Sequence, residues 1–238
     1  MIDHYDWAGG REAMLRFGPD HGPVMVAALP LLEEANRTRT FVVTLLRALA
    51  ERGIASVLPD LPGQGESLIP IADLTVLRLA EALEAVTVRL NAEGRLTFAL
   101  GIRSGALLDY CALHQGRWHL SPVTGAELLR DLHRVWLTQE RRPAGEQSLD
   151  AMIYGDDEPV VIAGTALSAD FLSSLSAAAP FDQPGIPRRL VRLAGDPRPA
   201  DRLVEGVALW RRAEPGNDPA LAARLADDIA AWMKTCAA

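Results

Sequence analysis

A glycine-bounded turn follows one of the most apolar runs of the chain. Gly101-Ile102-Arg103-Ser104-Gly105 comes directly after Leu96–Leu100. In a G-x-Nu-x-G turn between a strand and a helix, the central residue is exposed to the substrate and attacks it. Here that position holds Arg103, whose guanidinium stays protonated and cannot attack a carbonyl. We expect Ser104 to be a small helix-start residue with its amide facing the site; a nucleophilic Ser104 is the alternative.

The base and the acid of a serine-type triad are the next groups to find. All five histidines lie at or before His133, so the loop 214–219 before the final helix, where such a base is expected, contains none. Asp196 follows the run 190–194, which is a common place for a triad acid. Because no histidine is there for it to orient, we favour a turn role for Asp196.

Charged residues converge instead on one edge of the predicted sheet. Glu33, Glu34 and Arg37 follow one strand, Asp60 follows the next, and Arg103 follows a central one. Breaking a buried ion pair costs about 3–5 kcal/mol, so a buried Arg103 needs a partner. By topology that partner is Glu33 or Glu34. Arg103 then either forms a structural ion pair in an inactive site or holds an anionic or sugar-like ligand through its planar donors.

Aromatic side chains are a second means of binding a sugar. Trp118, Trp136, Tyr154 and Trp210 lie on apolar segments, where aromatic residues usually belong to the core. Only Trp136 is kept as a candidate, because it lies on a predicted cap helix.

The elements that must position these residues alternate between strand and helix. The patterns predict strands at 2–7, 11–17, 24–28, 54–59, 96–100, 118–123, 159–163, 189–194 and 206–211. They predict helices at 37–52, 73–92 (capped by Asp73), 106–114, 125–139, 168–178 and 219–234. Such alternation indicates one α/β domain over 1–238, with a mostly parallel central sheet and helices on both faces. A small helical cap is expected at roughly 124–158, and ligands should bind at the carboxyl edge of the strands.

Composition excludes several classes of protein. The net charge of −7, without a block of five like charges, argues against a nucleic-acid partner. No apolar run is long enough to span a membrane and no signal peptide is recognised, so we expect a cytoplasmic protein. Cys111 and Cys236 lie far apart and are expected to be reduced. Nothing in the sequence indicates a metal or another cofactor.

Three segments in order resemble the α/β-hydrolase superfamily. They are Ala28–Glu34, where that fold places an oxyanion-hole amide; Asp60–Ser67, which resembles its D-x-P-G-x-G-x-S turn; and the turn around Arg103. The resemblance adds Leu31 and Gln64 to the candidates. The candidate ligand-binding residues are therefore Leu31, Glu33, Glu34, Arg37, Asp60, Gln64, Arg103 and Trp136, and those for catalysis are Arg103, Ser104 and Asp196.

A more specific resemblance is to exosortase A system-associated hydrolases. Pro30–Arg39 is similar to the segment P-P-F-A-E-E-M-N-K-x-R of that group, and Gly101–Leu108 is similar to its G-L-R-x-G-A-L-L, which also carries arginine. Trp118–Gly125 and Val161–Ser168 resemble two further blocks. This resemblance, which fades after about residue 185, implies a hydrolase-like protein in an exopolysaccharide setting.

Three functions follow as hypotheses. The first is a degenerate hydrolase that binds a small anionic or sugar-like ligand without turnover. The second is an unconventional hydrolase of ester, thioester or acyl-glycan substrates, acting through Ser104 or through a water near Asp60 or Glu34. The third is a non-catalytic scaffold subunit. A homodimer is a further expectation.

Overall fold

The computed structural model describes residues 1–139, 148–154 and 158–236. Its main sheet has eight strands in the order β1-β2-β4-β3-β5-β6-β9-β10. β1 (Ile2–Trp7) and β2 (Gly10–Phe17) form an antiparallel hairpin, and β2 pairs antiparallel with β4 (Ala55–Pro59). The remaining pairs are parallel, through β3 (Val24–Ala28), β5 (Thr97–Ile102), β6 (Arg117–Leu120), β9 (Arg188–Leu193) and β10 (Arg202–Val204). The predicted mostly parallel sheet is confirmed.

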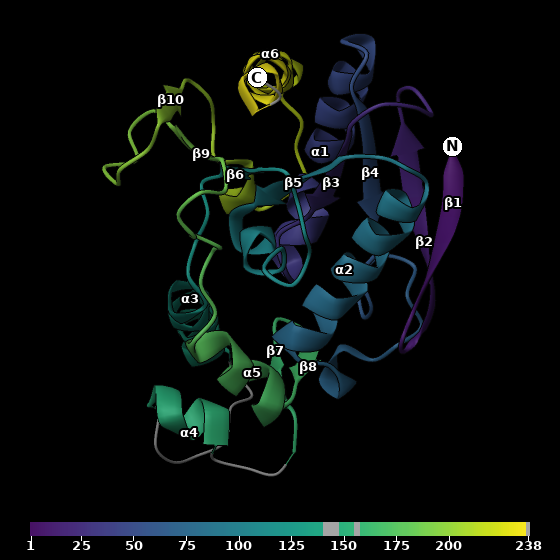
Figure 1. Ribbon diagram of the computed structural model, residues 1–238. Coiled ribbons are helices and arrows are strands. Elements are labelled where there is room, and N and C mark those ends of the chain that lie inside the picture. Colours follow the sequence, from purple (N-terminus) through teal and green to yellow (C-terminus); the bar gives the residue numbers. More distant parts are fainter. Residues whose placement is uncertain (140–147, 155–157, 237–238) are drawn as a thin grey trace.

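Helices cover both faces of the sheet because its central strands are apolar on both sides. In β3, Met25 and Ala27 pack into the core shared with α1 (Glu33–Glu51) and α6 (Pro219–Cys236). Val24, Val26 and Ala28 alternate with them and face the core on the side of α2 (Val76–Ala92). In Figure 1, α1 and α6 lie on one side of the strands and α2 on the other. This two-sided burial explains the unbroken apolar runs of the strands.

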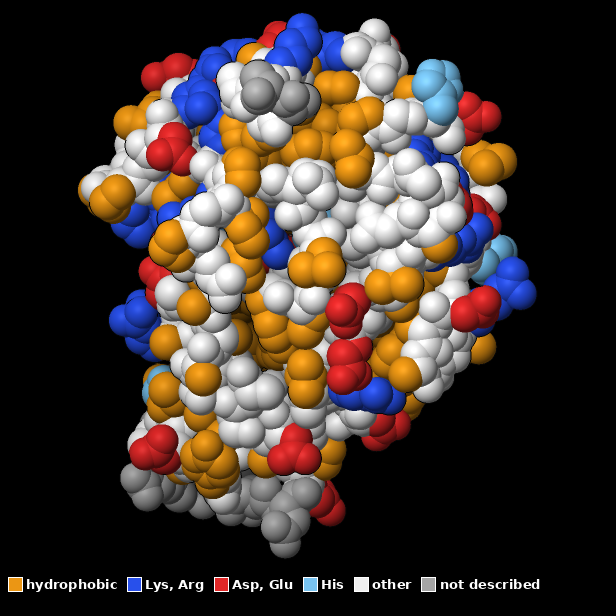
Figure 2. All heavy atoms as spheres, viewed as in Figure 1, with side chains coloured by type: hydrophobic (Ala, Val, Ile, Leu, Met, Phe, Trp, Pro, Cys, Tyr) orange, Lys and Arg blue, Asp and Glu red, His pale blue; other side chains and the backbone are white. Residues whose placement is uncertain are grey.

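A long excursion leaves the sheet after β6 and returns at β9. It contains α3 (Gly125–Thr138), α4 (Leu149–Tyr154), a hairpin of β7 (Val160–Ile162) and β8 (Thr165–Leu167), and α5 (Ala169–Ser176). The predicted strand 159–163 therefore lies outside the main sheet. Figure 2 shows hydrophobic side chains gathered in a hollow between the region of α3 and α5 and that of α2.

Two helix starts differ from the prediction. α1 begins at Glu33 rather than at residue 37, which places Glu33 and Glu34 in its first turn, where acidic side chains favour the helix dipole. α2 is capped by Thr75, whose hydroxyl accepts a hydrogen bond from the amide of Arg78. Asp73 instead ends a separate short turn, Ile71–Asp73.

The predicted helix 106–114 and the predicted strand 206–211 are wrong. After β5 the chain makes only a 3₁₀ turn, Arg103–Leu107, followed by bends. The guanidinium of Arg117 donates to the carbonyls of Asp109 and Ala112, so these carbonyls are held by a side chain rather than by helical amides. The last strand is β10, and Leu209–Arg211 forms a 3₁₀ turn that buries Leu209 and Trp210. The apolar residues of this segment suggested a strand, but they are buried by a turn instead.

Two further predictions concern membrane-spanning helices and the state of the cysteines. In the described ranges, no helix is both long enough and apolar enough to cross a bilayer. Both cysteines are free, as predicted.

Candidate functional site

The turn after β5 has the tight geometry that its two glycines indicate. Arg103 has φ 54°, which is in the left-handed region that residues with a Cβ rarely adopt. A Cβ at Gly105 would lie 2.4 Å from the carbonyl oxygen of Ala28, and a Cβ at Gly101 would lie 2.7 Å from the Cα of Ala106. Neither position can hold a larger residue without moving the backbone, so the two glycines fix the bend that carries Arg103.

Arg103 is buried and bound by a carboxylate. Its Nε and Nη2 donate to the two carboxylate oxygens of Glu34 at 3.1 and 3.2 Å, which confirms one of the two predicted partners. Its Nη1 donates to the carbonyl of Ser121 at 3.2 Å. The guanidinium carbon lies 4.9 Å from the ring centre of Trp210, a cation–π distance. Three of the five N–H donors are therefore used, and two remain for a ligand.

Ser104 lies at the start of the 3₁₀ turn Arg103–Leu107, in agreement with its prediction as a small helix-start residue. It is fully buried, and its hydroxyl caps no helix. Its Oγ instead accepts a hydrogen bond of 2.9 Å from the amide of Leu31. Leu31 lies in the loop between β3 and α1, where an oxyanion-hole amide is expected. That amide is thus already bound by a side chain of the same protein.

Asp196 lies in the loop after β9 and is held by arginines. Its two carboxylate oxygens accept hydrogen bonds from Arg198 at 2.9 and 2.7 Å, and Arg192 donates to it at 3.3 Å. The hydrogen bonds from Arg198 hold the pKa of Asp196 well below its usual range. Arg198 also donates to Glu127 of α3 at 3.2 Å. Asp196 therefore organises a loop and its link to α3, and it orients no imidazole.

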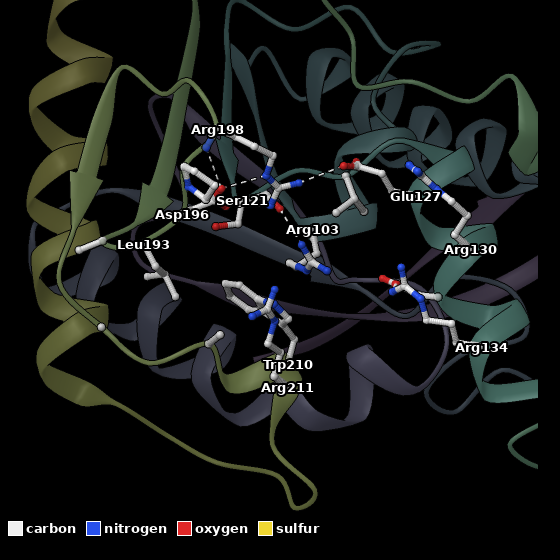
Figure 3. Close-up of a pocket in the computed structure, with 17 residues that line it drawn as sticks. Arg103, Ser121, Glu127, Arg130, Arg134, Leu193, Asp196, Arg198, Trp210 and Arg211 are labelled. Atoms are coloured by element: carbon white, nitrogen blue, oxygen red, sulfur yellow. Dashed lines mark hydrogen bonds and ion pairs between the residues drawn. The ribbon is translucent and has the colours of Figure 1, made fainter. Parts of the chain in front are cut away.

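A pocket of about 600 Å³ opens beside Arg103. It lies among β6, α3, the loop after β9 and the turn after β10, and its volume is within the usual range of ligand sites. Its charged lining residues are Arg103, Arg130, Arg134, Arg198, Arg211, Glu127, Asp131 and Asp196. In Figure 3, Arg130 and Arg134 extend from α3, while Trp210 and Arg211 come from the turn after β10. No histidine is among the lining residues in the described part of the chain.

The arginines of the pocket differ in how they are paired. Arg134 contacts Asp131 at 2.6 Å, and Arg198 contacts Asp196 and Glu127. Arg130 donates only to the backbone carbonyl of Ala126. Within the described ranges, neither Arg130 nor Arg211 has a carboxylate partner. The described part of the pocket therefore contains two guanidinium groups that no described carboxylate neutralises.

Most of the other predicted ligand-binding residues lie elsewhere. Glu33 pairs with Arg37 at 2.6 Å, and Arg37 also donates to the carbonyl of Trp210. Asp60 pairs with Arg39 at 2.8 Å; Asp60 and Gln64 line a separate cavity of about 30 Å³.

Leu31 and Trp136 are buried core residues on the α2 side of the sheet. Of the predicted residues, the pocket lining includes only Arg103 and Asp196.

The residues that sequence reasoning missed are those contributed by α3 and by the last two loops. Arg130 and Arg134 are one helical turn apart, and this spacing on the polar face of a predicted helix was a usable signal. Arg198 and Arg211 offered no such pattern, because their positions depend on how two irregular loops fold. Trp210 was assigned to the core; it is buried, but it also covers Arg103 and lines the pocket.

Comparisons with known proteins establish the fold. No protein-family model matches the sequence, and no curated protein matches it. The structure of Est1E from Butyrivibrio proteoclasticus with bound ferulic acid superposes with a TM-score of 0.62 at 14% identity, over 98% of this chain and 98% of that one. The epoxide hydrolase VrEH1 from Vigna radiata gives 0.61 at 16% identity, over 99% and 98%. A putative hydrolase from Agrobacterium vitis S4 gives 0.58 at 16%, over 98% and 97%. The chain has the α/β-hydrolase fold.

Proposed function

We propose that this protein is a catalytically inactive α/β-hydrolase-fold protein that binds a small anionic or sugar-like ligand beside Arg103. The observation that carries the proposal is the Arg103–Glu34 ion pair at the turn after β5. This turn would have to present a nucleophile in a working hydrolase. A permanently protonated guanidinium that is already bound to a carboxylate supplies no electron pair for attack.

The surroundings of Arg103 support the same proposal. The hydroxyl of Ser104, the one oxygen nucleophile in the turn, is bound to the amide of Leu31. The 3₁₀ turn Leu209–Arg211 places Trp210 over the guanidinium, and the following loop 214–219, where this fold carries its general base, contains no histidine. Arg103 thus replaces the nucleophile, the histidine base is absent from its expected loop, and the oxyanion amide is already bound to Ser104.

The charge of the pocket supports a ligand-binding role. Five arginines line it in a protein whose net charge is −7. Guanidinium groups bind carboxylates and phosphates through paired hydrogen bonds. The resemblance of Pro30–Arg39 and Gly101–Leu108 to exosortase A system-associated hydrolases supports an exopolysaccharide setting, in which acidic or phosphorylated sugars are suitable ligands.

Turnover is tested on the purified protein with a fluorophosphonate probe and a broad panel of acyl esters and thioesters. We expect no labelling and no hydrolysis, because the hydroxyl of Ser104 is bound to the amide of Leu31 and no histidine lines the described pocket. Ser104→Ala is compared with Ser56→Ala, which removes another buried serine hydroxyl away from the pocket. Hydrolysis that Ser104→Ala abolishes and Ser56→Ala spares would overturn the proposal in favour of an unconventional hydrolase.

Ligand binding is tested by calorimetry with glucuronate and glucose at low ionic strength. The carboxylate sugar should bind and the neutral sugar should bind more weakly, because only the former meets the free guanidinium groups. Arg211→Ala should weaken glucuronate binding. Equal affinities for glucuronate and glucose would contradict the proposal that the pocket prefers an anionic ligand.

A further inference from the structure

The two unpaired arginines of the pocket lie on different walls. Arg130 belongs to α3, whereas Arg211 belongs to the 3₁₀ turn between β10 and α6. We propose that the ligand carries two anionic groups on one sugar-sized body, such as two phosphates. One group binds at Arg211 beside Arg103, and the other binds at Arg130 beside Arg134. This inference rests on the ligand-binding function proposed above and adds the number and placement of the charges.

The charge balance of the pocket favours two anions over one. Its lining has five arginines and three carboxylates. Glu34, which pairs with Arg103, and Arg192, which pairs with Asp196, lie outside the lining and cancel each other, so the excess is two positive charges. The three carboxylates each contact an arginine, since Asp131 is bound by Arg134 and both Asp196 and Glu127 are bound by Arg198. Their repulsion toward an incoming anion is therefore reduced, and the excess charge remains with the unpaired arginines.

The pocket is large enough for a ligand that reaches both walls. A volume of about 600 Å³ corresponds to a sphere roughly 10 Å across, which is wider than one phosphate group and suited to a phosphorylated sugar. Figure 3 shows Arg130 and Arg134 extending from one side, with Arg103 between them and the turn that carries Arg211. A single small anion at one wall would leave the arginine of the other wall without an anionic partner.

Donor groups are available at both walls. Arg103 has two N–H donors left, and Arg211 follows Trp210, whose ring lies against Arg103, and lines the same pocket. At the other wall, the Nε of Arg130 donates a hydrogen bond of 3.2 Å to the carbonyl of Ala126. Its terminal nitrogens donate to no described group and remain available as donors. These planar donor sets match the spacing of phosphate or carboxylate oxygens.

Arg130 and Arg211 are both exposed, but only the subsite of Arg211 also includes buried groups. Arg103 and Trp210 are 6% and 7% exposed, whereas the side chain of Arg134 is 74% exposed. Salt screens an exposed charge more than a buried one. The anion near Arg103 should therefore bind less salt-dependently than the anion at α3.

The test compares fructose 1,6-bisphosphate, fructose 6-phosphate and fructose as probes, by calorimetry on the full chain. We expect the bisphosphate to bind about tenfold or more tightly than the monophosphate, which is the size of one charge-assisted contact. Arg130→Ala and Arg211→Ala should each bring the bisphosphate close to the affinity of the monophosphate. Arg47→Ala, which removes an exposed charge of α1 outside the pocket, is the matched control and should change neither.

Two outcomes would overturn the inference. One is equal affinity for the two phosphates, and the other is the absence of binding by either. If the monophosphate binds and the second phosphate adds nothing, the inference fails while the proposed anion-binding function stands. Hydrolysis of acyl esters that depends on Ser104 would instead overturn the proposed function, whatever the phosphate affinities.

Discussion

Arg103 and Glu34 stabilise each other across two elements, the turn after β5 and the first turn of α1. A guanidinium at this depth needs a counter-charge, because burial of an unpaired charge is unfavourable. The carbonyl of Ser121 and the ring of Trp210 complete its surroundings. The same contacts that keep Arg103 in place also leave a limited part of it open to a ligand.

Removal of the carboxylate at residue 34 should be costly. We expect Glu34→Gln to lower the free energy of unfolding by roughly 2–3 kcal/mol, somewhat below the usual loss for a broken buried pair, because the Glu34 side chain is 21% exposed. Urea unfolding followed by circular dichroism measures this loss.

Glu33→Gln is the matched control for that variant. It removes an adjacent first-turn acid, and hence the same helix-dipole contribution, but its pair with Arg37 is exposed and worth at most about 1 kcal/mol. Equal losses in the two variants would mean that the Arg103 pair contributes little.

The sequence predicted that Glu33 or Glu34 would pair with Arg103, because both follow a strand that the predicted topology places near the turn of Arg103, but it did not decide between them. It did not predict the bond between Ser104 and Leu31, which depends on the positive φ of Arg103 and on the path of the loop before α1. The pocket walls were missed for a similar reason: Arg198 and Arg211 are placed by irregular loops.

At the scale of elements, the turn after β5 packs closely against the backbone of β3 and of the loop that follows β3. Gly105 faces the carbonyl oxygens of Ala28 and Leu29, and a Cβ there would lie 2.4 and 2.5 Å from them. These oxygens belong to β3 and the loop after it, so they cannot move independently of the sheet.

Gly105→Ala should therefore destabilise the protein by about 2–3 kcal/mol through overpacking. Gly94→Ala is the comparison: its Cβ meets nothing within 4 Å, and its φ of +77° alone should cost about 1 kcal/mol. Thermal unfolding of the two variants gives the difference. A loss at Gly105 no larger than that at Gly94 would show that the strand and turn can separate easily.

The segment after this turn contains a buried polar cluster in place of the predicted helix. His119 contacts Asp109 at 2.8 Å, Arg117 lies 3.5 Å from the same carboxylate, and His114 is 6% exposed. Apolar periodicity over 106–114 suggested a helix, because it reports which side chains are buried and not which groups bind the backbone carbonyls. The decisive contacts come from Arg117, which lies outside that window.

Burial lowers the pKa of His114 from its ordinary value of 6.5 to about 4. Between these values the imidazole is neutral in the folded protein and protonated in the unfolded chain, so the unfolded chain binds more protons. Folded-state stability should therefore fall as the pH drops from about 6.5 toward 4, by up to about 1.4 kcal/mol per pH unit from this group. Urea midpoints for wild type and His114→Leu, measured from pH 7 to 4.5, test this; parallel curves would contradict it.

At the scale of the whole molecule, the sheet order brings the turn after β5 between β3 and β6, with the last two loops on the far side of β6. The alternation of apolar strands and amphipathic helices predicted a mostly parallel sheet with helices on both faces, but it did not predict this strand order. The placement of α3 beside the pocket was not predictable either, because nothing in the strand and helix pattern fixes where an excursion from the sheet packs.

Because a hydrolase needs groups from several of these elements at once, Arg103→Ser should not create an active enzyme. The new hydroxyl would face Trp210, no histidine lines the described pocket, and the amide of Leu31 would stay bound to Ser104. We expect no fluorophosphonate adduct by intact-mass spectrometry in a variant shown to be folded by circular dichroism. Stoichiometric labelling of residue 103 would show that the pocket still holds a working base.

The left-handed bend at Arg103 carries a guanidinium where this fold can carry a nucleophile. Its conformational penalty, about 1–2 kcal/mol, is imposed by the packing of Gly101 and Gly105 and is independent of the side chain that the bend carries. The backbone of the turn 101–105 therefore holds the Cα–Cβ direction of residue 103 fixed beside the pocket. Any side chain at residue 103 would be directed to the same place, so a substitution there changes which chemical group faces the cavity and leaves its position unchanged.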